Sequence, residues 1–168
     1  MQSKIVIGML LVILAVMNFS IFSKEQHLKQ GDTVYLKLAP VDPRSLMQGD
    51  YMALRFDAAD QLDNALKSQL DEKAKRSSEG QIVVRLDKNK IGSFESIYQG
   101  QPLEKDELKL NYRVRDDRVK FATNAFFFEE GTAELYEQAR YGEFKVNEQG
   151  ELLLNTMFAV QLTKIIAN

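Results

Sequence analysis

The sequence predicts an α+β fold, mainly antiparallel β, in which an N-terminal transmembrane helix precedes one β-rich domain with two helical excursions. Three observations predict this fold. They are an uncharged apolar run at residues 5–22, alternation of apolar and polar residues in several later segments, and helical spacing of apolar residues in two others. Of the 168 residues, roughly 145 lie beyond the apolar run, which is enough for one ordinary domain and leaves no room for a second catalytic one.

The N-terminal run reads IVIGMLLVILAVMNFSIF, in which only Asn18 and Ser20 are clearly polar. As a helix it would be roughly 27 Å long at about 1.5 Å per residue, which matches a thin hydrocarbon layer. Lys4 and Lys24 would then lie at the two interfaces. We therefore expect residues 1–24 to form a transmembrane anchor that contacts the lipid bilayer through residues 5–22.

A cleaved signal peptide is the competing interpretation of this run. Its cleavage site would need small residues at two positions, whereas the candidate sites NFS at 18–20 and IFS at 21–23 place large or polar residues there. An uncleaved signal-anchor is therefore the prediction.

Charge does not orient the anchor, because Lys4 and the terminal amine on one side face Lys24 and Lys29 on the other. A very short polar N-terminus is nevertheless typical of an anchor that translocates the chain that follows. We expect a single-pass protein whose soluble domain, residues 25–168, is extracytoplasmic.

Composition excludes several function classes. The chain has 22 basic and 24 acidic residues, and all of them except Lys4 lie beyond the apolar run, so the domain is slightly acidic and nucleic acid is not an expected partner. Cysteine is absent, which removes disulfides, thiolate metal sites, a cysteine nucleophile and a lipoprotein anchor.

Strand periodicity dominates from Asp32 onward. Apolar residues alternate with polar ones at 34–38, 82–86 and 108–114. Turn-forming sequences stand at 87–90, 115–118 and 147–150, which predicts hairpins. The final run, 152–166, predicts a long closing strand, and an antiparallel sheet is the natural assembly.

Two stretches have helical spacing instead. From Asp57 to Arg76, apolar residues such as Leu62 and Leu66 share one face while the other face mixes Lys and Asp. That mixture favours a solvated helix packed on the sheet over a membrane-binding helix, which would need a basic polar face. From Thr132 to Arg140 we expect a helix of two turns with Thr132 as its N-cap.

The most informative stretch is residues 39–56, which read APVDPRSLMQGDYMALRF. It resembles the GDYxxLxY family of membrane-anchored bacterial proteins, named for its Gly-Asp-Tyr signature. The resemblance extends from Lys24-Glu25 and Gly31 to Arg140-Tyr141-Gly142, and so covers most of the chain. One departure is visible, because Phe56 stands where the signature ends in tyrosine, which keeps the ring and removes the hydroxyl.

This resemblance implies an anchor in the bacterial cytoplasmic (inner) membrane and a periplasmic or other extracytoplasmic domain. Members of the family are often encoded beside multi-span membrane proteins, which makes such a protein a possible partner. The resemblance implies no established reaction.

The loop that carries the signature is the candidate ligand-binding or partner-binding site, with five residues proposed: Asp42, Arg44, Gly49, Asp50 and Tyr51. Asp42 followed by proline begins a turn, and Gly49 permits a backbone conformation that a side chain would oppose. Turn hydrogen bonds and an ion pair are the structural alternative for Asp42, Arg44 and Asp50.

A second candidate surface comprises Phe128, Glu130, Arg140 and Tyr141. Three consecutive phenylalanines, 126–128, precede Glu129-Glu130-Gly131. A core strand that ends at a turn is the ordinary interpretation of such a run. If two of the rings were exposed, they would form a patch for another protein or for lipid.

Enzyme mechanisms find little support. The single histidine, His27, is predicted to lie at the membrane interface, far from any nucleophile it could serve. Asp42, Asp50, Glu129 and Glu130 lack a recognisable metal-ligand spacing, so we predict no catalytic residues, no metal and no cofactor. Signal peptidases share a Gly-Asp before a strand, but Val41 stands where their serine nucleophile would be, and Ser45 comes four positions later.

The leading hypothesis is a membrane-anchored accessory or interaction protein of the bacterial envelope. The alternative is an envelope hydrolase with an unrecognised carboxylate or Ser/Lys site.

Overall fold

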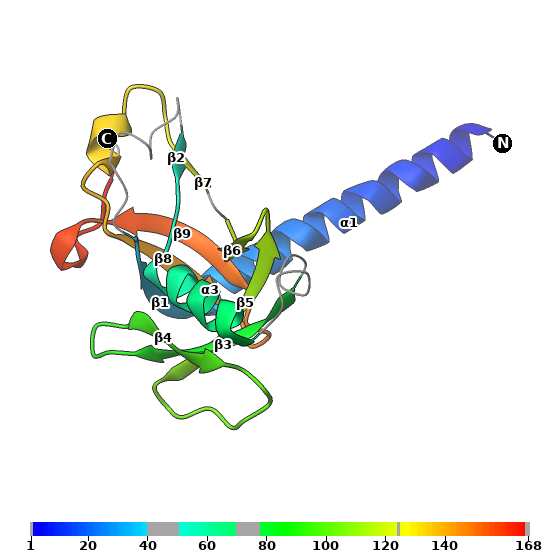
Figure 1. Ribbon diagram of the computed structural model, residues 1–168. Coiled ribbons are helices and arrows are strands. Elements are labelled where there is room, and N and C mark those ends of the chain that lie inside the picture. Colours follow the sequence, from blue (N-terminus) through cyan, green and yellow to red (C-terminus); the bar gives the residue numbers. More distant parts are fainter. Residues whose placement is uncertain (1, 40–50, 70–77, 124, 167–168) are drawn as a thin grey trace.

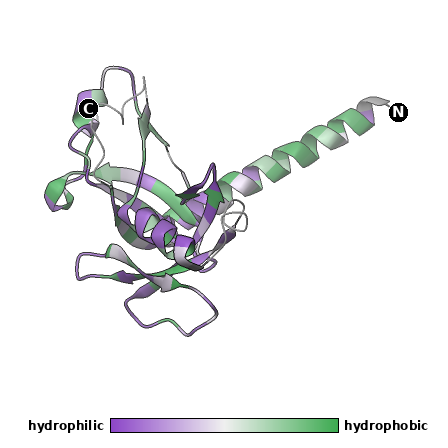
Figure 2. Cartoon of the chain, viewed as in Figure 1, coloured by the Kyte–Doolittle hydropathy of each residue, from purple (hydrophilic) through white to green (hydrophobic). Residues whose placement is uncertain are grey.

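A computed structural model of the chain describes residues 2–39, 51–69, 78–123 and 125–166. Helix α1 (Gln2–Gln30) projects from the β domain as a single rod (Figure 1). Among the described residues it is the one helix long and apolar enough to cross a membrane, and its apolar stretch is not buried in the domain. Figure 2 shows apolar residues along most of its length. The helix continues past residue 24, where the anchor was expected to end, as far as Gln30.

The last turn of α1 is attached to the domain rather than joined to it by a linker. His27 is buried, and its Nε2–H donates to the carbonyl oxygen of Lys145, 2.9 Å away. Gly31 alone separates α1 from β1 (Asp32–Lys37), and its N–H donates to the carbonyl of His27 at 2.9 Å. The histidine predicted to lie at the membrane interface is thus a buried contact between α1 and the sheet.

The main sheet has seven strands in the order β6-β5-β3-β4-β1-β8-β9. All neighbouring strands are antiparallel except β1 and β4, which are parallel. Besides β1, the strands of this sheet are β3 (Glu79–Leu86), β4 (Ile91–Ile97), β5 (Glu107–Arg115), β6 (Arg118–Lys120), β8 (Tyr141–Val146) and β9 (Leu152–Phe158). The predicted α+β fold class, mainly antiparallel, is confirmed.

All three predicted hairpin turns are confirmed. Asp87 accepts hydrogen bonds from two backbone N–H groups of the β3–β4 turn at 2.8 Å, and Asn147 does the same in the β8–β9 turn at 2.9 and 3.1 Å. In the β5–β6 turn, Asp116 and Asp117 have φ of 55° and 57°. This left-handed conformation suits the twist of a tight hairpin and is tolerated by short polar residues.

The sheet curls until its two ends meet. The backbone N–H of Asn111 in β5 donates to the carbonyl of Gly150 in the β8–β9 turn at 2.8 Å, and the side chain of Gln81 in β3 donates to the carbonyl of Gln149 at 2.9 Å. The β8–β9 turn therefore covers part of the edge of β5 that the short β6 leaves open.

The core lies inside the curl and is covered by α3 (Asp57–Gln69), whose Leu62 and Leu66 are fully buried. Eight strand residues have no exposed surface, namely Val34, Leu36, Ile82, Val84, Leu110, Val114, Phe144 and Met157. They occupy alternate positions in their strands, as half-buried strands require. Figure 1 shows α3 lying across the sheet. The predicted helix on the sheet is confirmed as far as Gln69. The rest of the prediction, residues 70–76, lies outside the described residues.

Two expectations about the C-terminal third were wrong. The closing strand ends at Phe158 instead of reaching Ile166, because Gln161 and Leu162 adopt φ of 64° and 54° within a short 3-10 turn, η1 (Val160–Leu162). The chain then returns along β9, where the N–H of Ile165 donates to the carbonyl of Met157 at 3.1 Å.

The second helix, α5 (Ala133–Tyr136), has one turn rather than the expected two. Thr132 does not cap it, because its hydroxyl donates to the carbonyl of Glu129 at 2.6 Å.

The α1–β1 junction predicts a specific sensitivity at Gly31. A Cβ atom there would lie 2.7 Å from the carbonyl oxygen of His27 and 3.0 Å from that of Val146, both backbone atoms that cannot rotate away. We expect Gly31→Ala to lower the free energy of unfolding by about 1–3 kcal/mol, as overpacking typically does. Thermal unfolding of the full chain in detergent measures it.

Gly8→Ala is the matched control, because a Cβ at Gly8 meets no atom within 4 Å. Equal melting temperatures for the two variants would contradict the proposed crowding at the junction.

Candidate functional site

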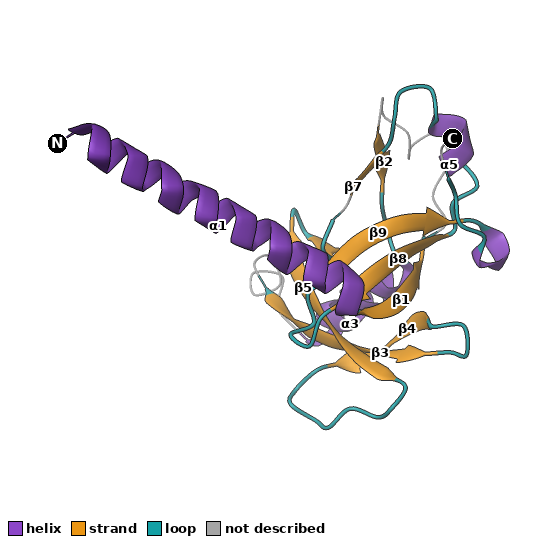
Figure 3. Cartoon of the chain, turned by 180° about the vertical axis from the view of Figure 1, so that it is seen from behind, coloured by secondary structure: helices purple, strands orange, loops and turns teal. Residues whose placement is uncertain are grey.

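The described part of the signature begins a two-stranded ribbon that stands apart from the main sheet (Figures 1 and 3). Strand β2 (Tyr51–Ala53) pairs with β7 (Ala125–Phe127) in an antiparallel ladder. Tyr51 lies opposite Phe127, and Met52 lies opposite Phe126. We call these two strands the arm.

The two faces of the arm differ in burial. Met52 is buried on one face, where Phe126 packs against Tyr136 of α5 with ring centroids 5.0 Å apart. On the opposite face, Phe127 is 74% exposed and its ring lies 5.7 Å from that of Tyr51. One face therefore holds the arm on the domain, while the other presents two aromatic rings to the surroundings.

The arm carries only one of the five residues of the candidate loop, Tyr51. Asp42, Arg44, Gly49 and Asp50 lie outside the described residues, so their proposed roles stay predictions. Tyr51 is half-buried at the start of β2.

The second candidate surface is brought together only in part. Phe128 stacks on Tyr136 with centroids 5.2 Å apart, whereas Glu130 is exposed in the turn that follows. Arg140 donates through Nη1 to the carbonyls of Glu137 and Ala139, at 3.0 and 2.7 Å. Within the described part of the chain Arg140 and Glu130 form no ion pair; Tyr141 is half-buried at the start of β8.

The rest of the signature belongs to the core. Leu54 and Phe56 are 7% and 3% exposed, and the Phe56 ring packs edge-on against Phe144 with centroids 5.3 Å apart. Phe56 also forms a single bridge with Leu38, so the predicted strand to residue 56 is interrupted after Ala53. The phenylalanine that replaces the signature tyrosine is therefore a packing residue, and its ring, not a hydroxyl, makes the contacts.

The exposed ring of Phe127 is the part of the candidate site that sequence reasoning located least well. Alternation within the run 126–128 does indicate that the middle ring points away from its neighbours. The pairing of Phe127 with Tyr51 joins segments far apart in the chain, and no local pattern reports it. Further exposed apolar side chains, Val160 and Ile166, come from the C-terminal segment, which lies with α5 at the arm's end of the domain (Figure 1).

Charged groups elsewhere are mostly paired on the surface. Arg85 contacts Glu95, Glu104, Asp106 and Glu107 at 2.8–3.3 Å. Its hydrogen bonds with Glu95 and then Glu104 raise the pKa of its guanidinium further above its usual range. Because the network is exposed, it contributes little to stability. Among the described residues, no three His, Asp or Glu side chains gather closely enough to hold a metal ion.

Several hollows adjoin the described domain surface, and two of them lie beside the β5–β6 hairpin. One of about 300 Å³ lies between α3 and the β5–β6 turn, and two ion pairs line it, Arg55–Asp60 at 2.8 Å and Lys67–Asp63 at 2.7 Å. The other, of about 430 Å³, lies at the base of α1 and includes Tyr112. Neither brings together a nucleophile and a base among the described residues.

These features define a class: a β domain carried on one N-terminal helix that is long and apolar enough to cross a membrane, with an aromatic arm as its protruding element. The family model described as "GDYXXLXY protein" matches residues 13–157. The chain therefore belongs to the GDYXXLXY family. No curated protein and no solved structure matches it.

The two faces of the arm predict opposite responses to truncation. Phe127→Ala should change the free energy of unfolding by less than about 0.5 kcal/mol, because little surface of that ring is buried. Phe126→Ala should cost about 1–3 kcal/mol, because it removes the contact with Tyr136. Urea unfolding of both variants measures the difference, and a larger loss for Phe127→Ala would show that its ring is packed.

Because of the buried phenol of Tyr112, we expect the free energy of unfolding to fall at alkaline pH. Burial raises the pKa of its phenol, with a hydrogen bond to Ser78 acting in the opposite direction. The folded chain thus binds this proton more tightly than the unfolded chain, so its contribution is complete below the unfolded pKa near 10 and is lost as the pH rises beyond it.

Tyr112→Phe should make this decline shallower in melting curves recorded from pH 8 to 11. Part of the decline in stability should persist in this variant, because Tyr35 contributes to it as well. Burial and then the charge of Glu143 raise the pKa of the Tyr35 phenol. An unchanged slope in Tyr112→Phe would show that the Tyr112 phenol ionises equally in both states.

Proposed function

We propose that this protein is a single-pass accessory protein of the bacterial inner membrane whose arm binds a neighbouring membrane protein on the extracytoplasmic side. The observation that carries the proposal is the exposed ring of Phe127, at 74% exposure, beside the half-buried ring of Tyr51. Large aromatic side chains dominate the binding energy of protein interfaces.

The anchor supports a membrane partner over a soluble one. Helix α1 extends about 12 Å beyond the end of the apolar run at Phe22 and then meets the sheet without a linker. If α1 crosses the membrane, the domain stays close to the bilayer surface, where loops of multi-span proteins are the nearest surfaces. A short tether also raises the effective concentration of partners in the same membrane.

The candidate loop is part of this proposal, because Asp50 directly precedes Tyr51 in the chain. A partner that covers Tyr51 would therefore also meet Asp50, whereas Asp42 and Arg44 stay candidates on the sequence alone. The hydrolase alternative gains no support from contacts in the described part of the chain, and Ser45 lies outside that part.

Site-specific photo-crosslinking tests the proposal. A photoreactive phenylalanine analogue is placed at position 127 of the full chain in native membranes, and at Leu103 as the control. Leu103 is a partly exposed apolar residue in the β4–β5 connection. We expect position 127, and not position 103, to capture one membrane protein reproducibly.

The same crosslink should weaken at least about tenfold in a Tyr51→Ala background, which corresponds to about 1.4 kcal/mol of lost binding free energy. Capture of lipid alone at position 127 would reassign the arm to the bilayer surface. Equal capture at 127 and 103, or none at either position, would contradict an interaction through the arm.

A further inference from the structure

We propose that the hollow at the base of α1 binds the headgroup of a phospholipid that carries a phosphodiester and a primary amine, the chemistry of phosphatidylethanolamine. We call this hollow the basal groove. Nine residues line it: Lys24, Glu79, Asn111, Tyr112, Arg113, Lys120, Ala122, Glu151 and Leu152. The inference rests on the proposed insertion of α1 into a membrane.

The basal groove lies where the ends of the curled sheet approach each other. One wall comes from β5, the end of β6 and the residues after it, the other from the start of β9, and Lys24 of α1 closes one side. Tyr112 and Leu152 are each 8% exposed and give the groove an apolar floor. Its volume, about 430 Å³, is of the size that accommodates small polar ligands.

The charges in the groove divide into paired and available groups. Glu79 accepts a hydrogen bond from Arg115 at 2.6 Å, and Lys120 pairs with Asp116 at 3.0 Å. Lys24 and Arg113, in contrast, form no ion pair with any carboxylate in the described ranges. The carboxylate of Glu151 accepts from the side-chain amide of Asn147 at 2.8 Å, and it too meets no cation there.

Two available cations and one available carboxylate in the same groove suit a zwitterionic ligand. A guanidinium and an ammonium are the groups that proteins use to bind phosphate, the guanidinium with two parallel N–H donors. The carboxylate of Glu151 would then take the ammonium of the headgroup. A purely anionic headgroup would satisfy Lys24 and Arg113 but would place its charge near Glu151.

The position of the groove relative to the bilayer favours a lipid over a soluble ligand. Lys24 follows Phe22, the last residue of the apolar run, by two residues, or about 3 Å along the helix. The polar layer on each side of a bilayer is about 5–7 Å thick. Lys24 therefore reaches the level of the lipid phosphates when residues 5–22 span the hydrocarbon.

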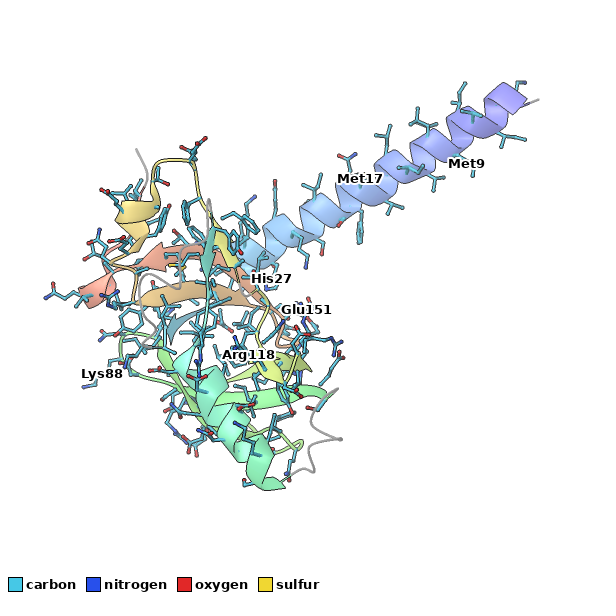
Figure 4. All side chains as sticks on the ribbon, turned by 45° about the horizontal axis from the view of Figure 1, so that its top comes forward. Met9, Met17, His27, Lys88, Arg118 and Glu151 are labelled. Atoms are coloured by element: carbon cyan, nitrogen blue, oxygen red, sulfur yellow. The ribbon has the colours of Figure 1, made fainter. Side chains whose placement is uncertain are left out.

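The attachment of α1 keeps the groove at that level. His27 holds the helix on β8 through its hydrogen bond to Lys145, and Gly31 leads directly into β1, so the sheet cannot move away from Lys24 as it could on a flexible linker. Figure 4 shows His27 and Glu151 at the base of α1, with Lys88 at a distant part of the domain. Lys88 is exposed in the β3–β4 turn and is thus a suitable control cation.

Native mass spectrometry of the full chain released from nanodiscs tests this site. The nanodiscs contain equal parts of phosphatidylethanolamine, phosphatidylglycerol and phosphatidylcholine, and resistance to carbonate extraction first establishes that the chain is inserted. We expect phosphatidylethanolamine to remain bound preferentially. The double variant Lys24→Gln, Arg113→Gln should lose retained lipid at least tenfold, whereas Lys88→Gln should match the native chain.

Glu151→Gln separates a headgroup site from a structural role. Loss of the carboxylate should abolish the preference for phosphatidylethanolamine over phosphatidylglycerol while total lipid retention persists. The same lipid profile in the native chain, the double variant and Glu151→Gln would overturn the proposal. Inorganic phosphate alone should not raise the melting temperature in detergent, and a rise equal to that given by phosphatidylethanolamine would overturn the assignment to a lipid.

Failure here is distinguishable from failure of the proposed function. A chain extracted by carbonate would contradict membrane anchoring, and therefore both proposals. An inserted chain that retains no lipid in the groove but still crosslinks to a membrane protein from position 127 would overturn the headgroup site alone.

Discussion

The contact between the last turn of α1 and strand β8 is the constraint on which the rest of the structure depends. A helix that ended at its apolar boundary would leave the domain on a flexible stalk. Instead, the buried imidazole of His27 donates to the carbonyl of Lys145, and Gly31 lets the two backbones approach closely enough for β1 to begin at once. Orientation of the sheet, of the arm and of the basal groove relative to α1 all follow from this one attachment.

The family signature combines two physical tasks in adjacent residues. Leu54 and Phe56 are core residues that join the chain to the sheet, while Tyr51 belongs to a ribbon that leaves it. A ribbon of three residue pairs has little stability of its own. It persists because Met52 and Phe126 are packed on the inner face, where Tyr136 supports the ring of Phe126, and this support makes an exposed ring at Phe127 possible without loss of order.

Local patterns predicted the elements well and their partners poorly. Alternation identified β1, β3 and β5, and turn residues such as Asp87 and Asn147 located the hairpins, because these signals depend only on neighbours in the chain. The parallel pairing of β1 with β4 and the covering of β5 by Gly150 depend on contacts between distant segments. No spacing in the sequence reports such contacts.

The candidate site was predictable to a similar extent. The signature directed attention to Tyr51, but its opposite ring, Phe127, lies in another segment. The burial of His27 was missed because the helix was expected to end near residue 24, just after the apolar run, whereas α1 continues through polar residues to Gln30. The end of β9 at Phe158 was not predicted. The left-handed backbone of Gln161 and Leu162 occurs there without a glycine that would have indicated a turn in the sequence.

The order of strands also constrains how the protein is made. β1 follows directly on α1 and lies inside the sheet, yet one of its two neighbours, β8, is almost the last strand to be synthesised. Such pairing between distant segments is slow to form, and until it forms the edges of β1 and β4 stay open. Because the chain is synthesised from its N-terminal end, it exposes unpaired strands until nearly all of it has been made. Nascent copies that are made close together would be vulnerable to pairing with each other, and a factor that shields strand edges would increase their yield.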